Sequence, residues 1–290
     1  MSGTTLAEVL AAARRRLAEA GIVDAAGDAR TLLVGLLGLT PTSFITRGDQ
    51  PLGEAERQTI DDALVRRIAR EPVHRILGRR AFSRLDLVLS PETLEPRPDT
   101  EVLVDALVPH AERIVREMGG CRILDLGTGT GAICLALLDL VPVATGIGAD
   151  LSVGALETAR RNADINGIAD RFETVESDWF AAVAGVFDII VSNPPYIVSS
   201  VVETLDDEVR LHDPILALDG GDDGLDAYRA IAAGAGVHLK ENGLVAYEIG
   251  YDQKDAVTAI MRESGFSRID AIQDLGGNDR VLLFSKAAAL

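Results

Sequence analysis

From residue 121 onward, short apolar segments alternate with helical segments, and this alternation constrains the fold more than any other feature of the chain. Strands separated by helices form an open, largely parallel sheet that is covered on both faces. Ligands of such sheets bind at the carboxyl ends of the strands. The sequence therefore predicts an α/β fold with its site at that edge. Its expected strands are Arg122–Leu126, Val143–Ala149, Phe172–Val175, Phe187–Val191, Leu244–Ile249, Ser267–Ile272 and Arg280–Phe284.

The chain before residue 79 has a helical pattern instead. A capping box at Thr5–Glu8 begins a first helix, and Asp28 is expected to cap a second helix that ends at Gly38. A third helix is expected from about Glu54 to Ala69. Its far face carries three arginines, which we interpret as a solvated helix face, with a docking surface for a partner as the alternative: Arg66, Arg67 and Arg70.

A short alternating segment and several prolines separate these two parts. Leu85, Leu87 and Leu89 alternate with other residues, which predicts a short strand or a hairpin. The prolines that follow exclude a long helix, and a new helix is expected to begin with Asp99 as its N-cap. We therefore predict a helical domain over residues 1–78, a linker over 79–98 and an α/β domain over 99–290.

The first strand of the alternation runs into a glycine-rich turn. Without Cβ atoms, Gly127, Gly129 and Gly131 allow the backbone to approach a ligand closely. At the end of the next strand, Asp150 can accept hydrogen bonds from both ribose hydroxyls of a nucleoside. Asp125 before the turn disfavours a pyrophosphate and suits the cationic amino group of a methionine moiety, directly or through water. The pattern predicts S-adenosylmethionine rather than a dinucleotide, whose glycine spacing differs; a turn without a ligand is the alternative.

Two further motifs follow strands. Asp178 can bond the adenine amino group and Trp179 can pack on the ring, unless Trp179 is a core residue that caps its strand. After the strand that ends at Val191, the sequence is Asn-Pro-Pro-Tyr. The side-chain oxygen of Asn193 and the carbonyl of Pro194 can accept hydrogen bonds from the two N–H groups of a planar amide or amino group.

These acceptors would hold the nitrogen in place and shift electron density onto it. The nitrogen needs this because its lone pair is delocalised, which makes it a poor nucleophile. Two prolines hold the carbonyl in place because their φ angles are locked. The ring of Tyr196 offers a flat face for stacking, and the transfer then needs alignment more than a strong base. Alternatively, the two prolines only terminate the strand.

Composition narrows the choice of partner. The net charge is -17, which disfavours a duplex DNA partner because phosphate contacts need a basic face. No secretory signal or membrane span is expected, which fits a cytoplasmic protein. The two cysteines, Cys121 and Cys134, are interpreted as buried free thiols. The histidines are scattered, so we expect no metal site.

Together, these motifs resemble those of the HemK-type protein-glutamine methyltransferases of peptide-chain release factors, and the resemblance covers nearly the whole chain. The segments that carry it are Leu124–Ile133, Asn193–Tyr196, Arg97–Glu101, Glu71–Gly78 and Gly220–Arg229. It implies a class I S-adenosylmethionine-dependent methyltransferase fold, which is Rossmann-like with a seven-stranded, mostly parallel sheet, and a small N-terminal helical domain that helps to bind the release factor.

The resemblance also implies roles for single residues. Arg97 and Thr100 would lie near the site, or would form a structural tie between domains. The substrate glutamine would be held by Asn193, Pro194, Pro195 and Tyr196. The cofactor would contact Gly127, Thr128, Gly129, Thr130, Gly131, Asp150, Trp179 and Asn193. Leu211-His-Asp-Pro214 departs from the aromatic-Glu-Pro that is more usual in the family.

Two rival functions remain at this point. A methyltransferase of the adenine amino group in DNA or RNA needs the same planar-nitrogen chemistry, but it must also flip the base and grip phosphates, and the chain has no basic, aromatic-interleaved segment. A non-catalytic binding protein could keep the cofactor fold, but the intact Asn193–Tyr196 motif argues against it. The long acidic loop over residues 197–226 is expected to be a binding element.

Overall fold

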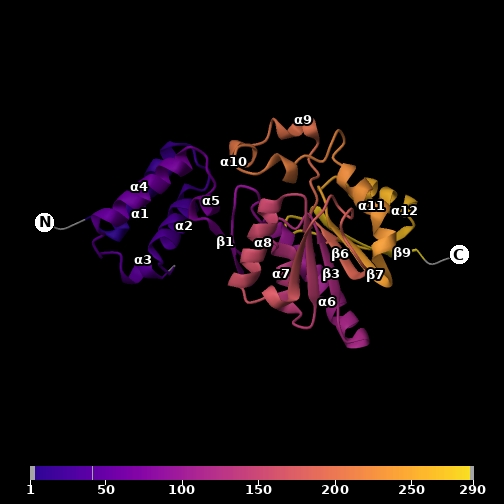
Figure 1. Cartoon of the computed structure of the whole chain (residues 1–290). Helices are drawn as coiled ribbons and strands as arrows, with labels where there is room; N and C mark the ends of the chain where they lie inside the picture. The colour runs from indigo at the N-terminus through magenta and orange to yellow at the C-terminus, as the bar shows by residue number, and fades with distance from the viewer. Residues whose placement is uncertain (1–3, 41, 288–290) are drawn as a thin grey trace. The chain divides into compact units, whose positions relative to one another are not determined.

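The computed structural model describes residues 4–40 and 42–287, and the contacts within it divide the chain into two compact units. The first unit extends to Arg79 and includes the distant segment Asp207–His212. The second unit comprises Arg80–Asp206 and the chain from Asp213 onward. Each unit has its own hydrophobic core, and Figure 1 shows the helices and strands that form it.

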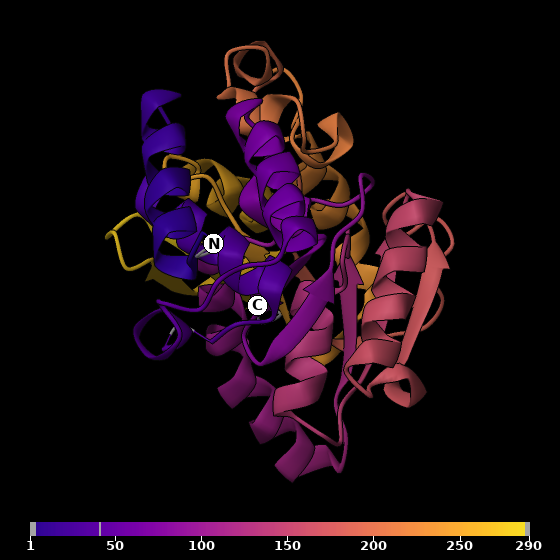
Figure 2. The ribbon, with the colours of Figure 1, turned by 90° about the vertical axis from the view of Figure 1, so that its left-hand side faces the viewer.

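The first unit is built from helices that pack against one another (Figures 1 and 2). The predicted capping box is confirmed: the Thr5 hydroxyl accepts from the backbone N–H of Glu8, and the Glu8 carboxylate accepts from the backbone N–H of Thr5. The apolar stripes of the helices form one core that includes Leu17, Leu33 and Leu64. The helices are α1 (Leu6–Glu19), α2 (Ala25–Leu37), α3 (Ser43–Thr46), α4 (Glu54–Ile68), α5 (Val73–Leu77) and α10 (Asp207–Arg210).

Two predictions about this unit were wrong. Helix α2 begins one turn earlier than expected, because the Asp24 carboxylate accepts from the backbone N–H of Gly27 and caps it. Asp28 therefore lies within the helix, where it pairs with Arg67 at 2.7 Å. Arg67 is buried and also pairs with Glu208 at 2.7 Å, so it does not belong to a solvated helix face.

The second unit contains a seven-stranded sheet in the order β5-β4-β3-β6-β7-β9-β8. All strands run parallel except β9, which is antiparallel to both of its neighbours. All seven predicted strands are present, and the predicted α/β fold is confirmed. The strands are β3 (Arg122–Leu126), β4 (Thr145–Asp150), β5 (Phe172–Glu176), β6 (Phe187–Ser192), β7 (Leu239–Glu248), β8 (Phe266–Gln273) and β9 (Asp279–Lys286).

Helices cover both faces of this sheet. Successive residues of β3 point to opposite faces: Ile123 packs with α6, α7 and α8, whereas Leu124 packs with α11 and α12. The chain moves from β3 outward to β5 and returns to β6 beside β3, which creates a topological switch point at their carboxyl ends. The helices and 3-10 turns are η1 (Pro98–Thr100), α6 (Glu101–Met118), α7 (Ala132–Leu140), α8 (Val153–Ile165), η2 (Ala169–Arg171), α9 (Ser199–Val202), η3 (Ile215–Ala217), α11 (Asp226–His238) and α12 (Lys254–Glu263).

Between the helical and α/β parts, the predicted short strand is one arm of a two-stranded sheet formed by β1 (Arg79–Phe82) and β2 (Leu85–Val88). The prediction for Asp99 was wrong. Pro98 starts a 3-10 turn that contains Asp99, so Thr100 occupies the cap position of α6 without a side-chain hydrogen bond. Cys121 and Cys134 are buried free thiols, as predicted.

Candidate active site

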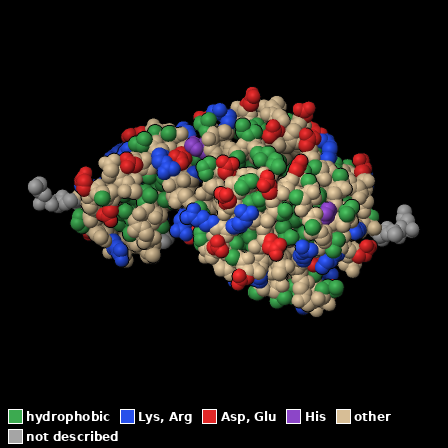
Figure 3. All heavy atoms as spheres, viewed as in Figure 1, with side chains coloured by type: hydrophobic (Ala, Val, Ile, Leu, Met, Phe, Trp, Pro, Cys, Tyr) green, Lys and Arg blue, Asp and Glu red, His purple; other side chains and the backbone are tan. Residues whose placement is uncertain are grey.

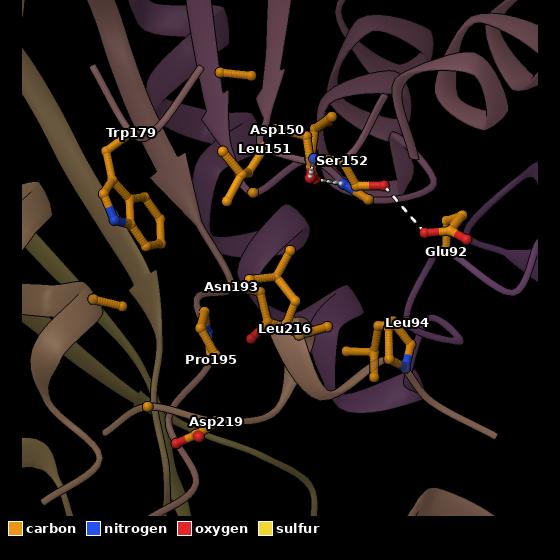
Figure 4. A pocket seen from close by; sticks show the side chains of 18 of the residues that line it. Glu92, Leu94, Asp150, Leu151, Ser152, Trp179, Asn193, Pro195, Leu216 and Asp219 are labelled. Carbon is orange, nitrogen blue, oxygen red and sulfur yellow. Dashed lines mark hydrogen bonds between the residues drawn. The ribbon is translucent and has the colours of Figure 1, made fainter. Parts of the chain in front are cut away.

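A cavity of about 750 Å³ opens at the carboxyl ends of β3, β4 and β6. Figure 4 shows the side chains of Asp150, Trp179 and Asn193 around this space. Its size lies in the range of small-molecule sites. The predicted residues that line it are Arg97, Thr100, Gly127, Thr128, Gly129, Thr130, Asp150, Asp178, Trp179, Asn193 and Pro195. Four other predicted residues do not line it: Asp125, Gly131, Pro194 and Tyr196.

The glycine-rich turn forms one wall of the cavity. The backbone N–H groups of Gly127 and Thr128 donate to the carbonyl of Ala149 at 2.8 and 3.0 Å, which fixes the turn to the end of β4. Gly127 and Gly129 have φ angles of 70° and 54°, and a Cβ atom on either would meet nothing within 4 Å. The turn thus needs glycine for its backbone conformation, and it leaves open space where a ligand can approach the main chain.

Asp150 ends β4 beside this turn. Its Oδ2 accepts from the backbone N–H of Gly129 and its Oδ1 from that of Ser152, both at 2.9 Å. Each carboxylate oxygen can accept more than one hydrogen bond. Asp150 is therefore held in place by backbone donors while it retains capacity to accept from a ligand in the cavity (Figure 4).

Asp125 lies beneath the turn rather than in the cavity. It is buried, and its Oδ2 accepts from the Thr128 hydroxyl at 2.8 Å and from the backbone N–H of Cys134 at 3.3 Å. Its Oδ1 has no hydrogen-bond partner among the described residues. Burial raises the pKa of Asp125 to about 7, against the lowering effect of the Thr128 hydrogen bond. The structure shows Asp125 shaping the turn through Thr128, which does line the cavity.

We expect the burial of Asp125 to make the free energy of unfolding depend on pH. Because its pKa rises from 3.8 to about 7 on folding, the native state binds this proton more tightly than the unfolded chain does. The free energy of unfolding should therefore fall as the pH rises through this interval and level off above pH 7. Urea unfolding of the wild type and Asp125→Asn should show the difference changing by up to about 1.4 kcal/mol per pH unit; a pH-independent difference would contradict the assignment.

The segment after β5 forms a second wall. Trp179 has a φ angle of 47°, which is rare for a large side chain and is found where surrounding contacts enforce it. The Ser177 hydroxyl donates to the Trp179 carbonyl at 2.8 Å and accepts from the backbone N–H of Ala182 at 2.9 Å. Trp179 packs partly on the core beside α11 and also lines the cavity.

The Asn-Pro-Pro-Tyr turn follows β6, which is buried throughout. Asn193 and Pro195 line the cavity, whereas Pro194 is buried and Tyr196 is partly buried against the core beside α11. Burial raises the pKa of the Tyr196 hydroxyl to about 12, so it stays protonated at neutral pH. The Tyr196 carbonyl accepts from Nε2 of Gln253 at 3.0 Å, which anchors the end of the turn.

The acidic loop returns to the Asn-Pro-Pro-Tyr turn. Ile197 donates to the carbonyl of Leu218 at 3.0 Å, and Gly220 donates back to the carbonyl of Ile197 at 2.8 Å. A Cβ atom on Gly220 would lie 2.8 Å from Cα of Tyr196, and one on Gly224 would lie 2.5 Å from its carbonyl oxygen. The glycines of this segment therefore allow two backbone segments to approach closely.

Arg97 connects the residues before α6 to the same loop. Its Nη2 donates to Oδ2 of Asp213 at 2.7 Å, and the Asp213 side chain is buried. Asp213 belongs to the segment Leu211–Pro214, so this segment supplies the acidic partner of Arg97. Both Arg97 and Thr100 line the cavity, and the ion pair lies within the second unit.

Sequence reasoning missed several residues that line the cavity or lie beside it. Glu92, Leu94, Leu216 and Asp219 line it (Figure 4), and they come from loops without a recognisable motif. Glu248 is buried at the end of β7. Its position at the carboxyl end of a predicted parallel strand was a signal that could have identified it.

Comparison with known proteins gives consistent matches. A family model described as the PrmC N-terminal domain matches residues 8–78, and one described as the methyltransferase small domain matches residues 98–208. A release factor glutamine methyltransferase of Agrobacterium fabrum is 56% identical over 99% of this chain and 100% of its own length. Another, of Rhodospirillum rubrum, is 44% identical over 99% of this chain and 87% of its own.

A solved structure supports the fold. The crystal structure of a methyltransferase from Pyrococcus furiosus aligns with a TM-score of 0.51 at 22% identity. The alignment covers 70% of this chain and 89% of that chain. The likeness is one of fold.

Proposed function

Since this chain belongs to the family of release factor glutamine methyltransferases, we propose that it transfers the methyl group of S-adenosylmethionine to a glutamine side chain. The acceptor is the amide nitrogen of the glutamine in the Gly-Gly-Gln motif of a peptide-chain release factor. The observation that carries this proposal is the position of Asn193, which lines the same cavity as the glycine-rich turn and Asp150.

The residues present fit S-adenosylmethionine, which supplies an electrophilic methyl group on its sulfonium when bound. The glycine turn leaves open space beside its backbone, and Asp150 retains acceptor capacity for ribose hydroxyls. Asp178 and Trp179 line the same cavity, and we propose that they receive the adenine. Asp125 acts in this scheme by holding Thr128 and the turn rather than by direct contact.

Asn193 lines the cavity, and its side-chain oxygen would accept a hydrogen bond from one N–H of the substrate amide. The carbonyl of Pro194, the next residue of the turn, would accept from the other N–H, although Pro194 does not line the cavity. These two acceptors would orient the nitrogen and favour the positive charge that develops on it. With S-adenosylmethionine bound, the nitrogen would form a bond to the methyl carbon while the bond between that carbon and sulfur breaks. The nitrogen then loses one proton to water. Tyr196 does not line the cavity. We propose that it supports the turn, because it packs against the core and its carbonyl accepts from Gln253.

The helical domain over residues 1–78 is proposed to dock the release factor. None of the described helices is long and apolar enough to cross a membrane. On the face shown in Figure 3, basic and acidic side chains are interspersed, and the net charge is -17. We propose a cytoplasmic enzyme with a protein substrate rather than a nucleic acid.

Replacing Asp150 by asparagine tests the cofactor assignment. Asparagine keeps the shape but can accept at one oxygen only, so the Kd for S-adenosylmethionine should rise roughly tenfold or more. Calorimetric titration would measure it, with the exposed Asp170→Asn as the matched control. An unchanged Kd for Asp150→Asn would remove Asp150 from the cofactor site.

The substrate is tested by incubating the protein with labelled S-adenosylmethionine and three acceptors in parallel. These are a release factor, its Gly-Gly-Ala variant and adenine-rich DNA. We expect label on the release factor only. Label on DNA alone would assign the chain to the adenine-methylating class, and equal label on the Gly-Gly-Ala variant would show that the glutamine is not the acceptor.

A further inference from the structure

Glu248 lies beside Asn193 at the carboxyl edge of the sheet. Strands β6 and β7 are parallel, with Ser192 opposite Tyr247, so Asn193 and Glu248 are the next residues on adjacent strands. Glu248 is 2% exposed, and its backbone carbonyl accepts from the hydroxyl of Tyr228 at 3.0 Å. A charged carboxyl group is rarely buried in this way, because burying a charge is costly unless the group is hydrogen-bonded.

Two polar side chains beside the Glu248 carboxyl group, those of Thr100 and Asn193, help to explain its burial. Burial has the largest effect on the Glu248 carboxyl and raises its pKa to about 6, while hydrogen bonding from the Thr100 and Asn193 side chains acts to lower the pKa. Nδ2 of Asn193 also donates to Oγ1 of Thr100 at 3.4 Å. Thr100 and Asn193 line the cavity, and Glu248 lies beside them without lining it.

The side chains of Glu248 and Thr100 can distinguish the two ends of the Asn193 amide. An ionised carboxylate only accepts hydrogen bonds, whereas the asparagine amide has one accepting and one donating end. The donating Nδ2 must therefore turn toward Glu248 and Thr100, which directs the accepting Oδ1 away from them. With the opposite orientation, an NH2 group would face the NH2 group of a substrate amide and could not accept its N–H bond.

We propose that Glu248 is a positioning residue for methyl transfer, which locks the Asn193 amide so that its Oδ1 accepts the N–H of the substrate amide. The inference rests on the proposed function, because only an acceptor at Asn193 makes the orientation matter. Glu248 acts through Asn193 and does not itself contact the substrate. Protonation of Glu248 would supply a donor and permit the opposite orientation.

The variant Glu248→Gln tests this directly. Oε2 of Glu248 has no hydrogen-bond partner among the described residues, so glutamine can turn either its oxygen or its nitrogen toward Asn193 and the lock is lost. We expect kcat for release factor methylation to fall roughly tenfold or more, with the Kd for S-adenosylmethionine within about twofold. The control is Asp188→Asn, which changes another buried carboxylate of the same sheet that pairs with Lys240.

A second measurement does not depend on activity. In nitrogen-15 spectra, the side-chain NH2 signals of Asn193, identified by their loss in Asn193→Ala, should shift with a midpoint near pH 6 and should stop shifting in Glu248→Gln. The other titratable groups around Glu248 are Arg280, Asp99 and the hydroxyls of Tyr196 and Tyr228. Asp99→Asn should leave the titration in place.

The outcomes separate the two proposals. If the wild type fails to methylate the release factor while the Asn193 signals titrate with Glu248, the lock stands and the substrate assignment fails. The positioning role of Glu248 is wrong if the wild type is active but Glu248→Gln retains full kcat. It is also wrong if the side-chain NH2 signals of Asn193 do not shift between pH 5 and 7. Since the titration is measured on the wild type, a variant that does not fold leaves the test intact.

Discussion

Replacing Asn193 by alanine is expected to lower kcat for methyl transfer roughly 100- to 1,000-fold, the cost of removing one preorganised group that stabilises developing charge. Asn193 lines the cavity, and the alanine variant has no side-chain acceptor for the substrate N–H. The Kd for S-adenosylmethionine should change little, because the glycine turn and Asp150 are untouched. Single-turnover transfer to the release factor and calorimetric titration of the cofactor would measure the two quantities.

The matched control is Asn166→Ala. Asn166 bonds the backbone of Asp86 on β2 through both ends of its amide, away from the cavity lining. Its loss should affect stability rather than kcat. If Asn193→Ala transferred methyl groups as fast as Asn166→Ala, Asn193 would have no part in holding the amide.

Adding a single methyl group at Gly224 should cost nearly as much activity. Its φ angle is +74°, and an added Cβ atom would lie 2.5 Å from the carbonyl oxygen of Tyr196 and 2.9 Å from Nε2 of Gln253. Either the loop or the Asn-Pro-Pro-Tyr turn must move, and displacements of about 1 Å near a reacting group can cost roughly 100-fold in rate. We expect Gly224→Ala to lower kcat by about that factor and also to reduce stability.

Gly236→Ala is the control for this glycine. Gly236 lies within α11, and a Cβ atom there would meet nothing within 4 Å. Alanine favours a helix over glycine by up to about 1 kcal/mol, so Gly236→Ala should raise the melting temperature and leave kcat unchanged. Wild-type activity in Gly224→Ala would show that the close approach to Tyr196 does not position the turn.

The sheet could be predicted because its signals are local. Each strand is a short apolar run between turn residues, and the strand ends fall next to the motifs, which places Asp150 and Asn193 at one edge by the rule for parallel sheets. Local signals identified the cap of α1 at Thr5 but not the cap of α2. Asp24 and Asp28 both suit an N-cap, and only the structure shows that Asp28 is engaged by Arg67.

The rest of the cavity could not be predicted because it depends on contacts between distant segments. Leu94 and Leu216 reach the lining from loops that have no periodic pattern. Gly220 and Gly224 belong to a recognisable motif, but only the structure shows why glycine is needed there: both approach the backbone of Tyr196 closely. Likewise, the proposed role of Glu248 depends on its proximity to Asn193, which only the pairing of β6 with β7 reveals.

Methylation of the amide nitrogen of one glutamine in a release factor can be tested on the product itself. The Gly-Gly-Gln peptide is isolated after reaction, the added methyl group is located by fragmentation mass spectrometry, and the peptide is then hydrolysed in acid. We expect a single methyl group on the glutamine and its release as methylamine. A methyl group on another residue, or one released as methanol from an ester, would contradict it.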